Sequence, residues 1–439
     1  MVVVEVFSPG PSRDAGFGRR WPARAALVAL ATVALALSAA GCGGGSSRGT
    51  VGLAWYIFPE PSGSFDQAAK ECSQASNGEY RITIHDLPND ADGQRQQMVR
   101  RLAAGDSGLD LLGLDVTWTP EFAEAGWIEP WPASRAARVR SGTLQTMLDT
   151  ATWKGKLYSA PFNTNTQLLW YRKDLVSHPP KTWADMLATA KRFAQERKPR
   201  SIEIQGAQYE GYVVWFNTLV NSAGGSILSP DGSRVVLGQP AVRALTIIRD
   251  LAHSPAADPS LSNQAENENR LRFEAGVAPF ELNYPFVYPS AKQNAPKIFK
   301  EMGWALYPRV NANEPSHVTI GGIDLAVSSL SKHKRQAFDA ITCLRKPEHE
   351  VTNAVKGGLP PVLVSVYQNP SFRKQYPFWQ TILQALKQAS VRPKTPAYQS
   401  VSLAIAYTIS PPGSINPQRA ERALHSRIAD AIVSKGLVP

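Results

Sequence analysis

Three carboxylate side chains, Asp115, Glu266 and Glu281, could act on a hydroxylated ligand. Two carboxylates at a fixed separation form the acid/base pair of a glycosidase, whereas carboxylates that line a cleft can bind hydroxyl groups without turnover. No local motif places any two of these residues at a catalytic separation. A binding site is therefore the favoured interpretation, and a secreted glycosidase is the alternative class.

Sequence motifs give no support for an enzyme of another class. The chain contains no HExxH or GxxxxGKS pattern, and its seven histidines show no metal-ligand spacing. We therefore expect no enzyme activity, no metal and no cofactor.

The elements expected around Asp115 alternate between strands and helices. Alternating or continuous apolar runs predict strands, and apolar residues at i, i+3, i+4 and i+7 predict helices. The series comprises strand Val51–Tyr56, a helix from Phe65, strand Tyr80–His85, helix Gln94–Ala104 and strand Leu109–Leu114. This alternation indicates an α/β sheet, in which ligands bind beyond the carboxyl ends of strands. Asp115 follows such an end.

A second α/β region follows the first. Its expected elements are strand Gln167–Tyr171, a helix after the capping box Thr182–Asp185, and helices Tyr212–Ala223 and Pro240–His253. Strand Val318–Val327 comes after them. A chain that leaves the first region near Ala160 and returns near Val318 would form two lobes joined by several crossings.

The amino terminus has the pattern of an export signal. Four arginines precede the apolar run Ala25–Ala40, whose 16 residues are fewer than the ~20 of a membrane-spanning helix. The small residues that follow end in Gly41-Cys42, which is typical of a bacterial lipobox, although Ala39 stands where Leu is more common. The sequence predicts lipidation of Cys42 and anchorage at the extracytoplasmic face of the membrane. A plain signal peptide is the alternative.

The net charge of +11 could indicate a nucleic-acid partner or an anionic cell envelope. No basic run or RNA-binding aromatic signature accompanies it, and export argues against nucleic acid. We expect a solvated basic surface and no nucleic-acid binding.

Cys72 and Cys343 are the remaining cysteines. Cys72 continues the apolar helical face of Phe65, Ala68 and Ala69, and Cys343 lies beside a similar face. Outside the cytoplasm two such cysteines could form a disulfide, and two free buried thiols are the alternative.

Several stretches together resemble a known family. They are Trp118–Trp131 (WTPEFAEAGWIEPW), Gly155–Pro161 (GKLYSAP), Leu169–Leu175 (LWYRKDL), Thr182–Leu187 (TWADML), Phe273–Phe286 and Gly321–Val327 (GGIDLAV). In this order and spacing they resemble the extracytoplasmic sugar-binding proteins of ABC importers, the maltodextrin-binding class.

A second set of stretches narrows the resemblance within that class. These are Asn163–Tyr171 (NTNTQLLWY), Val214–Leu219 (VWFNTL), Ser222–Leu228 (SAGGSIL) and Gly357–Pro360 (GGLP). They look similar to the mycobacterial trehalose-importer lipoproteins (LpqY-type), and Cys72 and Cys343 fall where cysteines of that type do.

The resemblance implies an α/β, two-lobed periplasmic-binding-protein fold with a hinge and an interlobe ligand cleft. The expected division is 1–41 lipoprotein signal peptide, 42–50 flexible tether, 51–161 first part of lobe 1, 162–317 first part of lobe 2, 318–365 return to lobe 1, and 366–439 C-terminal helices, mainly of lobe 2.

The resemblance also implies which residues bind the sugar. Carboxylates and amides would bind hydroxyl groups, and an aromatic side chain would stack on the apolar face of a ring. The residues that match ligand contacts of the family, or lie beside them, are Asp115, Asn165, Glu266, Tyr284, Glu60, Gln94, Gly358 and Leu359. For each of these residues the alternative is an ordinary structural role, namely a helix cap, a turn residue, a core aromatic or a solvated surface residue.

Two departures from the family concern the identity of the sugar. Tyr284 stands where the family has Trp, and Ala404 stands where its trehalose binders carry Arg. Loss of a buried bidentate donor can cost about 1–3 kcal/mol. We expect trehalose or a related disaccharide, with another α-glucoside or a substituted disaccharide as the alternative and a cell-envelope adhesin as a different class. The expected partners of this monomer are the permease subunits of an ABC importer.

Overall fold

The computed structural model of the chain describes residues 49–88 and 90–434. The chain divides into two units, Met1–Ser47 and Arg48–Pro439, and the described residues belong to the second. The expected lipidation site Cys42 lies outside the described residues. Among the helices of the described part, none is long and apolar enough to cross a membrane.

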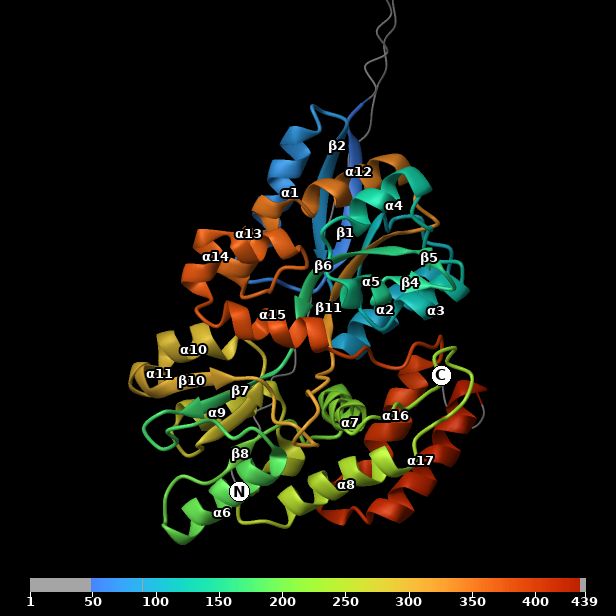
Figure 1. Cartoon of the computed structure of the whole chain (residues 1–439). Helices are drawn as coiled ribbons and strands as arrows, with labels where there is room; N and C mark the ends of the chain where they lie inside the picture. The colour runs from blue at the N-terminus through green and yellow to red at the C-terminus, as the bar shows by residue number, and fades with distance from the viewer. Residues whose placement is uncertain (1–48, 89, 435–439) are drawn as a thin grey trace, which may run out of the picture. The chain divides into compact units, whose positions relative to one another are not determined.

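The first lobe is built on a five-stranded sheet in the order β2-β1-β3-β11-β6 (Figure 1). Its strands are β1 (Val51–Ile57), β2 (Tyr80–Asp86), β3 (Leu111–Asp115), β6 (Ser159–Asn165) and β11 (Gly321–Val327). β1 pairs in parallel with β2 and β3, whereas β11 runs antiparallel to β3 and β6. Helices cover the sheet, so the apolar side chains of β3 are buried. Asp115 is the last residue of β3, as the sequence predicts.

Helices and a short hairpin complete the first lobe. They are α1 (Ser64–Ala75), α2 (Ala91–Ala103), α3 (Thr119–Glu124), α4 (Ala133–Arg140), α5 (Gln145–Thr150), the hairpin β4 (Thr152–Trp153) and β5 (Lys156–Leu157), α12 (Lys334–Leu344) and α13 (Pro347–Gly357). Helices α1 and α12 pack on each other, and the Cys72–Cys343 disulfide joins them. Both cysteines are buried.

The second lobe contains a four-stranded sheet in the order β10-β7-β9-β8. Its strands are β7 (Leu168–Arg172), β8 (Ile202–Glu203), β9 (Phe280–Asn283) and β10 (Met302–Ala305). Its helices are α6 (Trp183–Gln195), α7 (Glu210–Ser222), α8 (Gln239–Ala252), η1 (Leu261–Asn263), α9 (Glu266–Glu274), α10 (Val287–Asn294), α11 (Pro296–Glu301), α16 (Tyr398–Ile409), η3 (Pro412–Ser414) and α17 (Pro417–Ile432). Helices α7, α8, α16 and α17 pack together beside this sheet (Figure 1).

The chain passes between the lobes more than once. It leaves the first sheet after Asn165, enters the second at Leu168, and returns to the first at Gly321. The remaining elements, η2 (Val364–Gln368), α14 (Pro370–Gln375) and α15 (Trp379–Gln388), share a hydrophobic core with Met147 of α5 and Trp170 of β7. This core contains side chains from both lobes. The lobe boundaries expected from the sequence stay a prediction.

The sequence predicted most of the elements that flank Asp115 to within a few residues. The helix expected after Thr182 is α6, and the Thr182 hydroxyl caps it by accepting from the Asp185 backbone N–H at 3.1 Å. The predicted α/β fold is confirmed.

Candidate functional site

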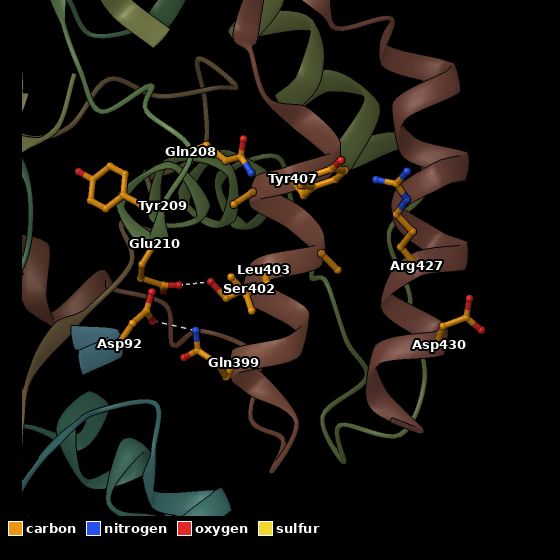
Figure 2. A pocket seen from close by; sticks show the side chains of 12 residues that line it. Asp92, Gln208, Tyr209, Glu210, Gln399, Ser402, Leu403, Tyr407, Arg427 and Asp430 are labelled. Atoms are coloured by element: carbon orange, nitrogen blue, oxygen red, sulfur yellow. Dashed lines mark hydrogen bonds between the residues drawn. The ribbon is translucent and has the colours of Figure 1, made fainter. Parts of the chain in front are cut away.

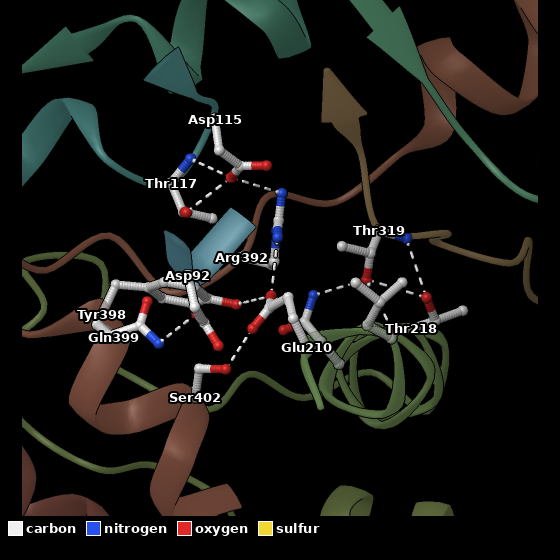
Figure 3. Close-up of polar contacts among 12 residues, drawn as sticks. Asp92, Asp115, Thr117, Glu210, Thr218, Thr319, Arg392, Tyr398, Gln399 and Ser402 are labelled. Carbon is white, nitrogen blue, oxygen red and sulfur yellow. Dashed lines mark hydrogen bonds and ion pairs between the residues drawn. The ribbon is translucent and has the colours of Figure 1, made fainter. Parts of the chain in front are cut away.

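Asp115 lies in a cluster of charged side chains that joins the two lobes (Figure 3). Arg392, between α15 and α16, donates from Nη2 to Asp115 Oδ1 at 3.1 Å and from Nη1 to Glu210 Oε1 at 2.7 Å. Asp115 belongs to the first lobe and Glu210 begins α7 of the second. We call Asp115, Glu210 and Arg392 the interlobe charge cluster.

Hydroxyl groups complete the hydrogen bonds of the interlobe charge cluster. The Thr117 hydroxyl and backbone N–H donate to Asp115 Oδ1 at 2.7 and 2.9 Å, and the hydroxyls of Tyr398 and Ser402 donate to Glu210. Glu210 also stands in the first turn of α7, where the helix dipole favours a negative charge. Among the described residues, Asp115 Oδ2 has no hydrogen-bond donor, so it keeps its capacity to accept one from a ligand.

Arg392 is almost fully buried, with a side-chain exposure of 5%. Burial lowers its pKa, but the neighbouring Asp115, Tyr398 and Glu210 outweigh burial and raise the pKa well above the ordinary range, so the side chain is a cation. The Arg392 Nε–H has no acceptor among the described residues. A buried donor without a partner is costly, and a ligand oxygen could satisfy it.

A cavity of about 430 Å³ adjoins Glu210 (Figure 2). This volume falls within the ~300–1,000 Å³ typical of small-molecule sites. Its wall combines carboxylates, amides, a guanidinium, aromatic rings and small side chains: Asp92, Gln208, Tyr209, Glu210, Gln399, Ser402, Leu403, Ala404, Ala406, Tyr407, Arg427 and Asp430. Gln399 donates to Asp92 Oδ1 at 2.8 Å, which joins α16 to α2 of the first lobe at the edge of the cavity.

Tyr284, predicted from the resemblance, lies within electrostatic reach of the interlobe charge cluster and of Glu266, which was also predicted. Burial and the charge of Glu266 raise the pKa of the Tyr284 phenol, and the charges of Arg392, Glu210 and Asp115 also act on it. Burial raises the pKa of Glu266, although the nearby Tyr209 opposes the shift. Tyr284 is thus close enough to both Glu266 and Asp115 for their charges to act on its phenol.

Glu60 and the segment from Gly358 to Leu359 form a separate group in the first lobe. Glu60 accepts from the Ser64 backbone N–H and hydroxyl at 2.8 and 2.7 Å, so it caps α1. Burial raises the pKa of Glu60, whereas the hydrogen bonds from Ser64 and Ser62 lower it. The hydrogen bonds outweigh burial, so the pKa of Glu60 is lower than its ordinary value. A Cβ added at Gly357 would lie 3.1 Å from Glu60 Oε1, which puts the end of α13 beside this carboxylate.

The backbone of the same segment turns at the end of α13. Gly358 has a φ of 70°, in the left-handed region that favours glycine, and Leu359 packs partly buried on the core of the first lobe. No hydrogen bond or ion pair within the described residues joins this group to the interlobe charge cluster.

The remaining predicted residues occupy other positions. Asn165 ends β6 at the crossing between the lobes, and its Oδ1 accepts from the Thr166 backbone N–H at 3.1 Å. Gln94 is buried in α2.

Glu281, the third carboxylate of the glycosidase alternative, is fully buried in β9 and accepts from Asn283 Nδ2 at 2.6 Å. It therefore cannot pair with Asp115 at an open catalytic site.

One group within the described residues could hold a metal by composition, namely Cys72, Cys343 and His349. The two cysteines form a disulfide, which removes their thiolates. This group does not fit a metal centre.

Sequence reasoning missed Glu210, Arg392 and Tyr398. Glu210 and Arg392 are 182 residues apart in sequence, and Asp115 and Arg392 are 277 apart. The only local signal was the acidic residue at the start of the apolar helix α7, and such a residue is equally typical of an ordinary helix terminus.

Comparisons with known proteins place the chain in a class. A maltose-bound structure of MalE3 from T. maritima superposes with a TM-score of 0.77 and 25% identity, covering 86% of this chain and 99% of that one. The GacH receptor of Streptomyces glaucescens, solved unliganded and with acarbose, has a TM-score of 0.76 at 18% identity and covers 88% of this chain and 99% of that one, so it supports the fold alone. These likenesses define the two-lobed fold of solute-binding proteins.

A match to a family model identifies the family of the chain. The model of the bacterial extracellular solute-binding proteins matches residues 67–377, and the chain belongs to this family. A probable ABC transporter-binding protein of Deinococcus radiodurans is 28% identical over 351 residues, 76% of this chain and 82% of that protein. The diacetylchitobiose binding protein DasA of Streptomyces coelicolor is 21% identical, covering 77% of this chain and 82% of that protein. The chain is thus a binding protein and not an enzyme.

Proposed function

We propose that the chain is the sugar-binding component of an ABC importer and that it binds trehalose or a related disaccharide between its lobes. The observation that carries the proposal is the interlobe charge cluster, which puts carboxylates of both lobes around one buried arginine beside a cavity. Charged groups make the stronger hydrogen bonds to hydroxyls, and the aromatic rings of Tyr209 and Tyr284 offer apolar faces. The diacetylchitobiose-binding and maltose-bound relatives support a sugar as the ligand.

The identity of the disaccharide depends on the wall of the cavity. Ala404 lines it in place of the arginine of trehalose binders. Arg392, bound to Glu210 at 2.7 Å, supplies a guanidinium next to the cavity and could offset that loss. The replacement of that arginine by Ala404 favours the alternative ligands, namely another α-glucoside or a substituted disaccharide.

A thermal-shift screen with the full chain, in a detergent without a sugar head group, tests the proposal. Trehalose, maltose, cellobiose and diacetylchitobiose are the first sugars. We expect a saturable rise in melting temperature with at least one disaccharide and no release of glucose or N-acetylglucosamine during incubation. Release of either monosaccharide would indicate a glycosidase, and no shift with any sugar would leave an adhesin and contradict the proposal.

The mechanism we propose is hinge closure. Because Asp115 and Glu210 belong to different lobes, a sugar that bonds to both would bind the closed state more tightly than the open state and shift the population toward it. Small-angle scattering should then show a smaller radius of gyration at saturating sugar. An unchanged radius at saturation would contradict closure.

We also propose that lipid on Cys42 anchors the chain at the outer face of the membrane. The Cys42→Ser variant tests this, because it removes the acceptor thiol and leaves the preceding signal intact. The variant should leave the membrane fraction, whereas the parent chain should remain in it. Equal membrane association of both chains would contradict the anchor.

A further inference from the structure

The outer part of the cavity follows α16 away from the interlobe charge cluster. Gln399, Leu403 and Tyr407 are spaced four residues apart, so they form one row along the helix. At a rise of ~1.5 Å per residue the row is about 12 Å long. Gln399 lies at its inner end, bonded to Asp92, and Tyr407 lies at its outer end. The cavity therefore continues about two helical turns beyond the residues that join the lobes.

Large apolar side chains of this row are exposed to solvent. Leu403 is 50% exposed and Tyr407 is 67% exposed, whereas Ile405 and Ile409 of the same helix are fully buried in the core of the second lobe. Leu403 and Tyr407 thus contribute little to folding. An exposed leucine and tyrosine on the wall of a cavity offer an apolar face that a sugar ring can cover.

One polar side chain of α17, that of Arg427, lies beside Tyr407 at this end of the cavity (Figure 2). The Arg427 guanidinium lies over the Tyr407 ring, with Cζ 5.5 Å from the ring centroid, and its Nη1 donates to Thr408 Oγ1 at 3.0 Å. Asp430 is one helical turn further along α17 and also lines the cavity. A supported aromatic ring and a guanidinium therefore meet at the outer end, whereas the Asp430 carboxylate lies away from them, near the level of Leu403 (Figure 2).

We propose that this outer end is a second subsite, which binds one more sugar ring of an oligosaccharide with at least three rings. The inference rests on the proposed function, because the first two rings would bind beside the interlobe charge cluster. Tyr407 would stack on the apolar face of the additional ring, and Arg427 would bind its hydroxyl groups. The small side chains of Ala404 and Ala406 leave room along the wall between the two ends.

Calorimetric titration of the full chain, in a detergent without a sugar head group, tests the subsite. The probes are trehalose and three pairs that differ by one ring: maltose and maltotriose, cellobiose and cellotriose, and diacetylchitobiose and triacetylchitotriose. For a pair whose disaccharide binds, the trisaccharide should bind about 10-fold more tightly, as expected for one stacked ring with its hydrogen bonds. The Tyr407→Ala variant should lose that gain and keep the affinity for the disaccharide.

Two variants serve as controls. Tyr407→Phe keeps the ring and should retain most of the gain, and Val433→Ala, which trims another exposed apolar side chain, should change neither affinity. Equal affinities of the parent chain for both members of every binding pair would overturn the subsite and leave the proposed function standing. If Tyr407→Ala weakens the binding of both sugars of a pair equally, or weakens the binding of neither, the subsite is likewise overturned and the proposed function still stands. Binding of trehalose without binding of any trisaccharide would also overturn the subsite and leave the proposed function standing. No binding of any probe, trehalose included, would overturn both proposals.

Discussion

The carboxylates of the interlobe charge cluster and those inside the second lobe differ in how the protein compensates them. Asp115 and Glu210 share the buried cation Arg392 and keep exposures of 22% and 27%. Glu203 and Glu281 are register partners on β8 and β9 and are fully buried. They accept hydrogen bonds from neutral groups: Ser201 and Gln264 bond to Glu203, and Asn283 bonds to Glu281.

The pKa values of Glu203 and Glu281 reflect their burial among neutral groups. Burial, opposed by the hydrogen bonds, raises the pKa of Glu203 to about 7 and that of Glu281 to about 8. A carboxyl that keeps its proton at neutral pH suits the interior of a lobe. A carboxylate that is matched by an arginine and partly open to solvent suits a polar ligand. Under the proposed function, Asp115 and Glu210 would bind the ligand, whereas Glu203 and Glu281 belong to the interior of the second lobe.

The largest effect on stability is expected from removal of the shared cation. Arg392→Ala would leave the carboxylates of Asp115 and Glu210 without a counter-charge. Breaking a fully buried pair costs ~3–5 kcal/mol, and the partial exposure of both acids reduces this to about 2–4 kcal/mol. Urea unfolding measures the loss. As a control, Arg335→Ala removes an exposed partner of Glu79 and should cost less than about 1 kcal/mol. Similar losses in the two variants would refute the special role of Arg392.

A smaller and pH-dependent effect is expected from the buried pair. The pKa of Glu281 is about 8 in the folded chain against an ordinary value of 4.5, so between these pH values the folded state holds a proton that the unfolded state has lost. The free energy of unfolding therefore falls as the pH rises from about 5 to 8. Glu281→Gln should remove this penalty and be more stable than the parent by about 1–2 kcal/mol at pH 9, with no gain at pH 5.

The Glu314→Gln variant is the control for this experiment, because it makes the same substitution at a side chain that is exposed to solvent. Urea unfolding at both pH values gives the comparison. A stability difference between Glu281→Gln and the parent that does not change with pH would contradict the assignment of the proton to Glu281.

The smallest effect concerns Glu60, which the resemblance assigns to the ligand and the structure uses as a helix cap. Glu60→Gln weakens the bonds to Ser64 and should lower stability by about 1 kcal/mol at pH 7. Because the pKa of Glu60 is lowered in the folded chain, this difference should shrink as the pH falls through that pKa. Sugar affinity within twofold of the parent would indicate a cap alone, whereas a tenfold loss would assign Glu60 to the ligand as well.

The sequence was informative where the signal is local. The apolar run of β3 ends at Asp115, so the place of this carboxylate at the carboxyl end of a buried strand followed from hydrophobic pattern alone. The hydroxyl of Thr182 and the N–H of Asp185 are three residues apart, and their cap was equally visible.

The sequence was silent where distant segments meet. Arg392 lies in an irregular segment between two helices, and nothing near it indicates that its guanidinium reaches Asp115 and Glu210. Tyr407 belongs to a helix with a buried face, and its exposure depends on how α17 packs beside α16. Such tertiary contacts are decided by the packing of whole elements, which a single sequence pattern does not encode.

Sugar titration of the parent chain and Asp115→Ala, each followed by calorimetry, tests the central claim most directly. Asp115 is the contribution of the first lobe to the interlobe charge cluster, and its Oδ2 has no donor among the described residues. The parent should bind a disaccharide with one saturable site. Asp115→Ala should bind it about 10- to 100-fold more weakly, the loss expected for a charged hydrogen-bond acceptor. Equal affinity of the two chains for every sugar that binds would contradict a sugar site at the interlobe charge cluster.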